Sequence, residues 1–547
     1  METVIQKNEH FEIEIIDMGE GGEGIGKIND FTLFIPGGLI GDLVEVRIVK
    51  VKKSYGYGKM IKLIKPSPFR QEVSCELGGK CGGCQLQHMN YKAQLEWKQK
   101  KVENCLKRIG KLENIVVEPT LGMEEPYRYR NKAQYPIRKE DGKVVMGFFA
   151  PRSHRLVPLS DCAIQHVDNA RIMEIVRKFL QDNDISIYNE ETHKGLVRHL
   201  VIKTGYHAEE IMVCLVINGK KLPHSEKLVK ALQEIPQICS IILNHHVEKN
   251  NVILGDSCTV LSGKPNIIDS IGTLKFNISP LAFFQVNPLQ TEVLYQKALE
   301  YAELTGKEIV WDAYCGIGTI SLFLAQKAKK VYGVEIVPQA IENAKENAKL
   351  NGISNTEFFA GKAEEVIPDL YKKGVIADTI VVDPPRKGCD TKLLETLKAM
   401  APQKIVYVSC DPATLARDLA YLTNEAGYQV EKVQPVDMFP HTTHVETVVL
   451  LSKGEIDSKK VRVEFSLEDM DMSGFQKGAT YEQIKAYVLE HSGLKVSSLY
   501  ISQIKRKCGL DVGQNYNLSK KENAKVPKCP PEKEAAIMEA LKHFQMT

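Results

Sequence analysis

The chain has 547 residues, too many for one domain at roughly 100–200 residues per domain. Hydrophobic residues make up 43% and charged residues 26%, as in globular proteins, so a disordered or fibrous chain is excluded. There is no apolar run of about 18 residues and no signal-peptide pattern at residues 1–10, so we expect no membrane association and a cytoplasmic location. A formal net charge of +3 neither demands nor excludes a nucleic-acid partner.

Residues 1–66 are predicted to form a small OB-like β-barrel. Apolar or alternating stretches typical of short strands occur at 11–16, 31–35, 43–49 and 59–64, and a glycine-rich turn at 19–24. Closely spaced short strands of this kind favour a barrel. The prolines at 66 and 68 indicate a linker to the next domain.

Three further regions follow the barrel. Residues 67–275 mix a helix at 91–109 with strands at 200–203 and 211–216, which predicts an α+β domain. Residues 276–453 alternate regularly between strand and helix, which implies a doubly wound, mostly parallel sheet. Residues 454–547 form a C-terminal extension that we expect to be small and mainly helical. The fold class is therefore multidomain α/β.

A tight glycine loop follows the strand that begins near 308. Gly316 and Gly318 allow backbone N–H groups to approach a ligand closely, and a helix is expected at 321–330. Glu335 ends the next strand, about 20 residues on, where a carboxylate can bind ribose hydroxyls. The third glycine of the dinucleotide motif is absent, so an adenosine ligand without phosphates, such as S-adenosylmethionine, fits better. A tight turn without a ligand is the alternative.

Three more strands carry polar residues to their ends. Asp383 ends an apolar strand as Asp-Pro-Pro, and Cys410 ends the next one as Ser-Cys-Asp-Pro. Glu446 begins a late apolar strand. Ligands bind at the carboxyl ends of parallel strands, so we expect these side chains to share one site.

The motifs at 383–388, 409–418 and 444–448 resemble those of the RNA 5-methyluridine methyltransferase family, and the resemblance covers about residues 10–452. It implies a Rossmann-like methyltransferase domain and methyl transfer from S-adenosylmethionine to uracil C5 in RNA. Asp411 stands where the family usually has Asn. The resemblance also implies four residues that bind the cofactor: Gln285, Tyr314, Glu335 and Asp383.

Uracil C5 is too weak a nucleophile to take a methyl group from a sulfonium directly. A thiolate that adds to C6 activates C5, and a carboxylate can then remove the C5 proton so that the thiolate leaves. Cys410 is therefore the expected nucleophile and Glu446 the expected base. The alternatives are a buried strand-end thiol for Cys410 and a solvated acid for Glu446. His441 and His444 are interpreted as loop residues, with a role in substrate contacts as the alternative.

Four cysteines form a candidate metal site. Cys75, Cys81 and Cys84 lie in a glycine-rich stretch, and Cys162 could supply the fourth thiolate. Spacing alone does not decide between zinc and an iron–sulfur cluster. The set resembles the iron–sulfur branch of the same family, the 23S rRNA (uracil-5-)-methyltransferases, which implies a [4Fe-4S] cluster; zinc remains the alternative.

The expected partner is RNA. Basic and aromatic residues alternate at 50–59 within the barrel, which resembles a TRAM domain, and again at 127–132. Arg152, His154 and Arg155 could join this surface. A solvated edge strand is the alternative at 50–59. The target uracil is expected to flip out of the RNA.

These observations predict a 23S rRNA uracil-C5 methyltransferase with no obligate protein partner. A tRNA uracil-C5 methyltransferase is the first alternative. From a different class, the chain could be a non-catalytic RNA-binding ribosome assembly factor. The basic stretch at 500–507 is either an RNA contact or a charged surface helix.

Overall fold

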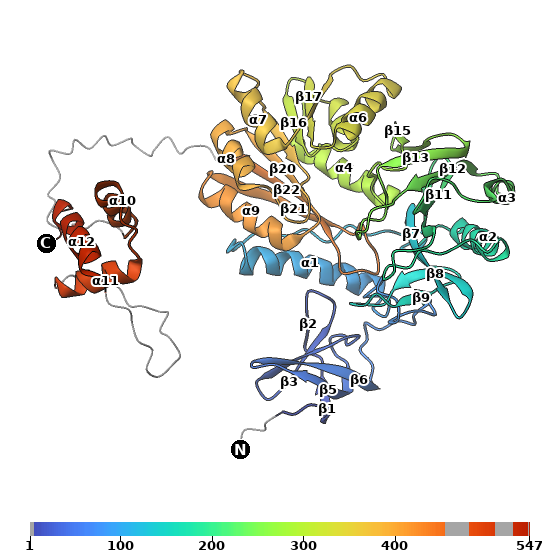
Figure 1. Cartoon of the computed structure of the whole chain (residues 1–547), viewed down its shortest axis with the longest axis horizontal. Coiled ribbons are helices and arrows are strands. Elements are labelled where there is room, and N and C mark those ends of the chain that lie inside the picture. The colour runs from blue at the N-terminus through green and yellow to red at the C-terminus, as the bar shows by residue number, and fades with distance from the viewer. Residues whose placement is uncertain (1–4, 454–480, 509–528, 545, 547) are drawn as a thin grey trace. The chain divides into compact units, whose positions relative to one another are not determined.

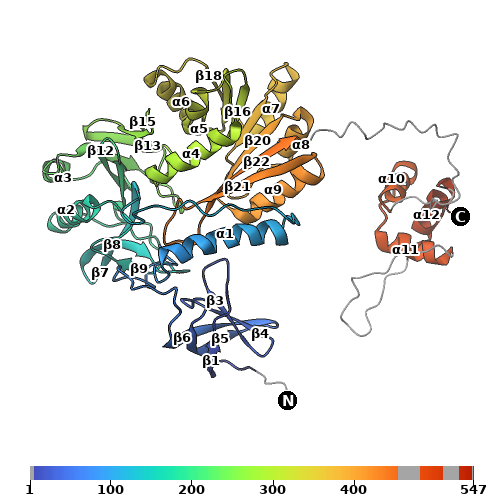
Figure 2. The ribbon, with the colours of Figure 1, turned by 180° about the vertical axis from the view of Figure 1, so that it is seen from behind.

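The computed structural model describes residues 5–453, 481–508, 529–544 and 546. The chain divides into two compact units, Met1–Glu455 and Ile456–Thr547, and each is described by itself. Figures 1 and 2 show the arrangement of elements within each unit from opposite sides. None of the described helices combines the length and apolar character that a membrane span needs.

The N-terminal barrel is a six-stranded sheet in the order β1-β5-β6-β4-β3-β2. Its strands are β1 His10–Glu14, β2 Asp17–Met18, β3 Gly24–Ile28, β4 Phe31–Ile35, β5 Leu43–Val51 and β6 Tyr55–Lys65. The four predicted strands are confirmed, but the sequence analysis missed β2 and β3, since the turn predicted at 19–24 extends into β3 at Gly24. A side chain at Gly26 would collide with Ile13 of β1, so this glycine lets two strands pack closely.

The central region begins with helix α1 (Tyr91–Arg108) and contains a seven-stranded sheet in the order β13-β12-β11-β10-β7-β8-β9. Its elements are β7 Lys132–Glu140, β8 Lys143–Phe149, β9 Leu156–Pro158, α2 Asp168–Asp182, β10 Val197–Gly205, β11 Glu210–Ile217, α3 Ser225–Leu232, β12 Ile238–His245 and β13 Ser257–Gly263. Helices α2 and α3 bury one face of this sheet (Figure 1). The hairpin β14 (Ile267–Ile271) and β15 (Leu274–Ile278) follows.

The third region is a seven-stranded sheet in the order β18-β17-β16-β19-β20-β22-β21, parallel from β18 to β20 and antiparallel at β22 and β21. Its strands are β16 Ile309–Ala313, β17 Lys330–Glu335, β18 Thr356–Ala360, β19 Thr379–Val382, β20 Lys404–Ser409, β21 Tyr428–Val436 and β22 Glu446–Lys453. Its helices are α4 Pro288–Ala302, α5 Thr319–Ala325, α6 Pro338–Leu350, α7 Ala363–Lys372, α8 Thr391–Met400 and α9 Pro412–Asn424.

Alternate residues along these strands face two separate cores. Val310 packs with α4, α5 and α6, while the adjacent Trp311 packs with α7, α8, α9 and α1. This alternation explains why the strands read as continuous apolar runs, since both faces are covered (Figure 2). The helix predicted at 321–330 is too long. Lys330 already belongs to β17, where it pairs with Ile309 of β16, so the chain must leave the helix and turn before Lys330.

The C-terminal unit contains α10 (Tyr481–Ser492), α11 (Ser498–Lys507) and α12 (Pro531–His543). Apolar residues from all three helices form a separate core, including Ile484, Ile504 and Ile537. Two of the basic residues at 500–507 have partners within this unit: Lys505 lies over the ring of Tyr481, and Lys507 pairs with Glu534. Residues 454–480, 509–528, 545 and 547 of the predicted extension lie outside the described residues.

Candidate active site

A cavity of about 780 Å³ opens at the carboxyl edge of the methyltransferase-like sheet. Three lining residues directly follow parallel strands: Tyr314 after β16, Asp383 after β19 and Cys410 after β20. Glu335 is the last residue of β17. Glu446 starts the antiparallel strand β22, which reaches the same edge because Thr447 pairs with Ser409. Gln285 also lines the cavity, so the structure brings together all six side chains singled out for catalysis and cofactor binding.

The glycine loop orients Glu335 toward the cavity. The N–H groups of Gly316 and Val337 donate to its two carboxylate oxygens, at 3.2 Å and 2.9 Å. Tyr314 has a φ of +73°, a left-handed conformation that is uncommon outside glycine, and its N–H donates to Val334. The side of Gly316 where a Cβ would stand is open. An oriented carboxylate beside an open loop fits the ribose of S-adenosylmethionine, whose hydroxyls can donate to it.

Two carboxyls in the cavity have strongly raised pKa values. Burial raises the pKa of Asp383 to about 7. Burial, followed by the negative charge of Asp383, raises the pKa of Glu446 to about 8, while Arg386 opposes the shift. Both groups can therefore exchange protons near neutral pH, as acid–base catalysis requires.

The Cys410 thiol is half-buried between these groups. Burial, and then the charges of Glu446 and Asp383, raise its pKa to about 12, and the cation of Arg386 acts in the opposite direction. The thiol is therefore protonated in the free protein and must lose its proton as it attacks. Asp411 caps helix α9 by accepting N–H groups from Ala413 and Thr414, a role that Asn performs equally well.

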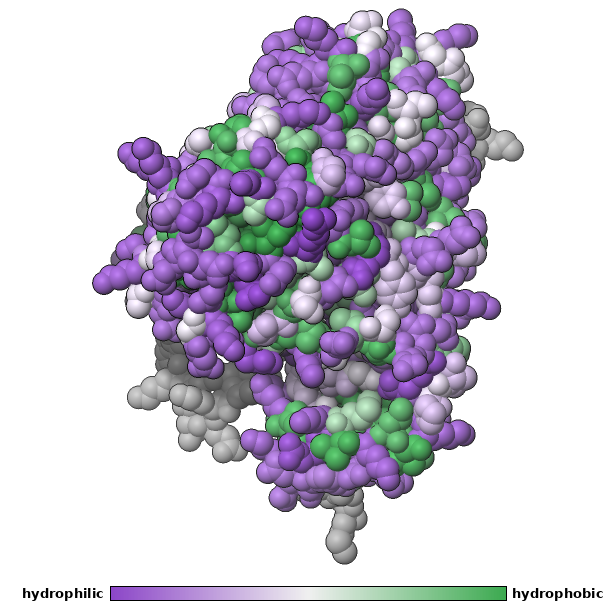
Figure 3. Space-filling model, turned by 90° about the vertical axis from the view of Figure 1, so that its right-hand side faces the viewer, coloured by the Kyte–Doolittle hydropathy of each residue, from purple (hydrophilic) through white to green (hydrophobic). Residues whose placement is uncertain are grey.

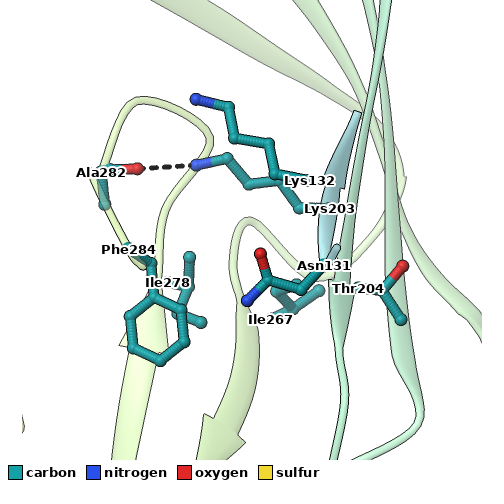
Figure 4. A pocket seen from close by; sticks show the side chains of 8 residues that line it. All are labelled: Asn131, Lys132, Lys203, Thr204, Ile267, Ile278, Ala282 and Phe284. Atoms are coloured by element: carbon teal, nitrogen blue, oxygen red, sulfur yellow. Dashed lines mark hydrogen bonds between the residues drawn. The ribbon is translucent and has the colours of Figure 1, made fainter. Parts of the chain in front are cut away.

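The loop that carries Gln285 is held from behind by the central sheet. The amine of Lys203 donates to the carbonyls of Ser279 and Ala282, at 2.9 Å and 2.8 Å, and Asn131 Nδ2 donates to the carbonyl of Gln285 at 2.9 Å. Figure 4 shows Lys203 reaching Ala282. A void of about 10 Å³ lies beside these residues. Burial, and then the neighbouring Lys132, lower the pKa of Lys203 to about 7.

Sequence reasoning assigned no role to several residues that line the cavity. Arg386 and Lys387 stand in the quoted Asp-Pro-Pro motif, which is the signal that could have identified them. Phe439 and His444 line the same cavity from the loop before β22. Phe283 also lines it and is 69% exposed, so an apolar ring stands at its mouth.

The four candidate metal-binding cysteines are half-buried and free of disulfides. Burial, and then the charges of Cys162, Cys81 and Cys75, raise the pKa of Cys84 to about 12. The four sulfurs are thus close enough to interact electrostatically. Within the described part of the chain, no three His, Cys, Asp or Glu side chains are arranged to hold a metal ion. Four thiols match the donors of an iron–sulfur cluster, and the cluster itself stays a prediction.

The barrel presents a mixed aromatic, basic and apolar surface on β5 and β6. The rings of Phe34, Tyr55 and Tyr57 pack against one another at centroid distances of 5.7–5.8 Å, and Lys50 and Lys59 are exposed beside them. Figure 3 shows apolar side chains among hydrophilic ones on this barrel, the lowest part of that view. Its exposed apolar residues include Val49, Val51, Ile61, Leu63 and Ile64.

The predicted RNA contact of Tyr129 is wrong, because its side chain is 1% exposed and its hydroxyl donates to the carbonyl of Pro440. Arg128 is paired with Asp161, the residue before Cys162. A tyrosine in a basic stretch can stack on a nucleic-acid base only when its ring faces solvent. Arg152, His154 and Arg155 are exposed, and their contact with RNA stays a prediction.

Comparisons with known proteins agree with this geometry. Residues 90–454 match the family model described as tRNA (uracil-5-)-methyltransferase, and residues 6–61 match the TRAM domain. A Clostridium tetani protein named as an uncharacterized RNA methyltransferase is 55% identical over 82% of this chain and 97% of its own length. A Clostridium acetobutylicum protein with a similar name is 52% identical over 83% of this chain and 99% of its own.

A solved structure of 30% identity is similar over most of the chain. It is the Pyrococcus abyssi tRNA (uracil-54, C5)-methyltransferase in complex with S-adenosyl-L-homocysteine, which is 30% identical, has a TM-score of 0.64, and covers 80% of this chain and 99% of its own. Residues after 454 lie outside both family models. The chain belongs to the tRNA (uracil-5-)-methyltransferase family and is an S-adenosylmethionine-dependent RNA (uracil-5-)-methyltransferase with a TRAM domain.

Proposed function

We propose that the protein methylates C5 of a uridine in 23S rRNA through a covalent bond between Cys410 and uracil C6, resolved by Glu446. The observation that carries this proposal is the single cavity lined by Cys410, Glu446 and Asp383. Its volume of about 780 Å³ leaves room for both a cofactor and a flipped-out nucleotide.

The first step joins Cys410 to the base. Its Sγ–H proton passes to the carboxylate pair as Sγ bonds to C6, and the C5=C6 electron pair moves toward the C4 carbonyl oxygen. Arg386 supports this step, because its cation favours the thiolate. Burial of the thiol keeps the unbound protein in its unreactive, protonated form.

The later steps place a methyl group on C5 and restore Cys410. Bound S-adenosylmethionine supplies an electrophilic methyl group and leaves as a neutral thioether. With the thiol proton held by Asp383, the ionised carboxylate of Glu446 then accepts the C5 proton, the C5=C6 bond reforms, the bond between Sγ and C6 breaks, and the released sulfur takes the proton back from Asp383. A pKa of about 8 makes Glu446 a stronger base than an exposed glutamate once it is ionised.

Four residues are proposed to hold the cofactor. Glu335, oriented by two backbone N–H groups, binds the ribose. Gln285 and Tyr314 line the same cavity, and Asp383, which also lines it, is proposed to lie near the methyl donor and the uracil.

The assignment of 23S rRNA rests on the resemblance of the four cysteines and the TRAM domain to the ribosomal RNA branch of the family. A tRNA substrate is the second candidate, because the solved relative that spans 80% of this chain is named as a tRNA enzyme. We further propose that Cys75, Cys81, Cys84 and Cys162 hold a [4Fe-4S] cluster. Their mutual effect on pKa values supports the grouping, and the chemistry above requires no electron transfer.

The test is methyl transfer from labelled S-adenosylmethionine to unmodified 23S rRNA and to tRNA in separate reactions, read as 5-methyluridine by mass spectrometry. Label in 23S rRNA that is lost in Cys410→Ala and kept in Cys258→Ala would support the proposal. Cys258 is a suitable control because it is exposed and lies outside the cavity lining. Label in tRNA alone would assign the second candidate, and retention of transfer in Cys410→Ala would refute the covalent mechanism.

A further inference from the structure

His441 has an unusual conformation close to the proposed base. It lies in the loop between β21 and β22, five residues before Glu446, and its side chain is fully buried. Its φ is +67°, in the left-handed region that costs free energy for residues other than glycine. Such strain persists only where the surrounding contacts hold the backbone in place.

Those contacts come from two segments far away in the sequence. The backbone N–H of His441 donates to Gln94 Oε1 at 2.9 Å, and the ring lies on Tyr127 with centroids 4.5 Å apart. The carbonyl of His441 accepts two consecutive N–H groups, from Gln85 at 3.0 Å and from Leu86 at 2.9 Å. The strained residue is thus held at its backbone N–H, its carbonyl and its ring.

The two consecutive N–H groups belong to the segment that carries the cysteines. Gln85 directly follows Cys84, and its side-chain amide donates back to the carbonyl of Gly82 at 2.8 Å. The N–H of Gly83 donates to Cys81 Sγ at 3.3 Å. A change in how the sulfurs are held would therefore move the N–H groups that hold His441.

The loop has a second support that does not involve the cysteines. Asp437 forms an ion pair with Lys98 of α1 in which both side chains are fully buried, and Lys98 also donates to the carbonyl of Phe439 at 3.0 Å. This support fixes the start of the loop. The stretch from His441 to Glu446 follows it. The cysteine segment holds this half at His441, and Lys101 of α1 donates to the carbonyl of Thr443 at 2.8 Å.

We propose that His441 is a positioning residue through which the segment bearing Cys75, Cys81 and Cys84 holds Glu446 in place. The proposal rests on the proposed roles of Glu446 and of the cysteines. When the segment is intact, the strained loop presents Glu446 to the cavity. When the segment is released, His441 relaxes and Glu446 moves, while Gln285 and Glu335 keep their places on other elements.

A matched pair of substitutions tests the backbone conformation. His441→Asn and His441→Val both remove the imidazole, but Asn tolerates a positive φ and β-branched Val does not. We expect His441→Val to accumulate a methylated Cys410–RNA adduct with ordinary uridine RNA, because the C5 proton is removed about tenfold more slowly. We expect His441→Asn to resolve the adduct nearly as fast as the wild type. Equal resolution rates in the two variants would overturn the proposal.

The link to the cysteines is tested by hydrogen exchange of residues 437–446 in Cys84→Ser, with Cys258→Ser as control. We expect faster exchange in Cys84→Ser alone, with S-adenosylmethionine affinity within about twofold of the wild type, since binding residues on other elements are unaffected. Unchanged exchange would refute the link. If Cys84→Ser fails to fold, the His441 pair still decides the positioning role. If the wild type makes no 5-methyluridine, the proposed function fails, and the exchange comparison still tests the link.

Discussion

Asp383 and Glu446 face one cavity, and the negative charge of Asp383 adds to burial in raising the pKa of Glu446 to about 8. Asp383 directly follows a parallel strand and Glu446 begins an antiparallel one, so the mixed end of the sheet brings the two carboxyls together. The pair holds a proton near neutral pH, and its ionised form increases as pH rises.

The first prediction concerns stability and pH. The pKa of Glu446 is about 8 when folded and near 4.5 when unfolded, so the folded state holds the proton more tightly between these values. Stability from this group is complete below pH 4.5 and is lost as pH rises toward 8. We therefore expect Glu446→Gln to raise the free energy of unfolding at pH 8, by about 1–3 kcal/mol, and to change it little at pH 4.5.

Denaturant unfolding at several pH values measures this difference. The exposed Glu395→Gln is the control, and its effect should not depend on pH in the same way. A gain for Glu446→Gln that is equal at pH 4.5 and pH 8 would show that burial does not shift this carboxyl.

The second prediction concerns Arg386. Its positive charge lowers the pKa values of both Cys410 and Glu446. We expect Arg386→Met to slow formation of the covalent adduct with 5-fluorouridine RNA about tenfold, the effect of one pKa unit, and to move the acidic limb of the pH–rate profile to higher pH. Lys387→Met is the control. Lys387 lines the same cavity, but its charge is not one of the main causes of the pKa shift of Cys410. An unshifted profile in Arg386→Met would contradict the electrostatic role.

The sequence predicted the residues at strand ends and missed those that support them. Tyr314, Asp383 and Cys410 could be grouped because the carboxyl ends of parallel strands meet at one edge, whatever the side-chain packing. Lys98 could not be assigned a supporting role from the sequence. Its partner Asp437 is 339 residues away, and a lysine on a predicted helix is normally expected to face solvent. His441 also read as an ordinary loop residue, since neither its burial nor its positive φ is visible in the sequence.

The same limit explains two errors of boundary and exposure. The helix after Gly318 ends at Ala325 because strand pairing at Lys330 sets where the chain must turn, not because the intervening residues disfavour a helix. Tyr129 reads as an RNA contact by composition, yet it is buried between the central region and the loop at Pro440. Both outcomes depend on contacts between segments that are far apart in the sequence.

The third prediction concerns Lys203, which holds the loop that carries Gln285. Lys203→Met keeps the length of the side chain, removes the side-chain donor of the Ala282 carbonyl, and leaves the Ser279 carbonyl with the N–H of Ala282 alone. We expect the Kd for S-adenosylmethionine to rise about tenfold, since the buried Ala282 carbonyl, left without its donor, favours a displaced loop. Lys132→Met, its cross-strand neighbour, is the control. Calorimetry measures the Kd for S-adenosylmethionine in both variants. Equal Kd values for Lys203→Met and Lys132→Met would contradict the role assigned to Lys203.

The fourth prediction concerns the contact between the TRAM domain and the loop before Glu446. A Cβ at Gly22 would stand 3.0 Å from Thr443 and 3.1 Å from Leu86, whereas a Cβ at Gly37 would meet nothing within 4 Å. Both glycines have a φ of +79°, so Gly22→Ala and Gly37→Ala carry the same backbone strain and differ in the collision alone. We expect Gly22→Ala to lower kcat/KM for RNA methylation about three- to tenfold, because the shifted loop carries the proposed base. Gly37→Ala should match the wild type in this assay, and both should bind S-adenosylmethionine normally. Equal kcat/KM values in the two variants would show that this contact does not contribute to catalysis.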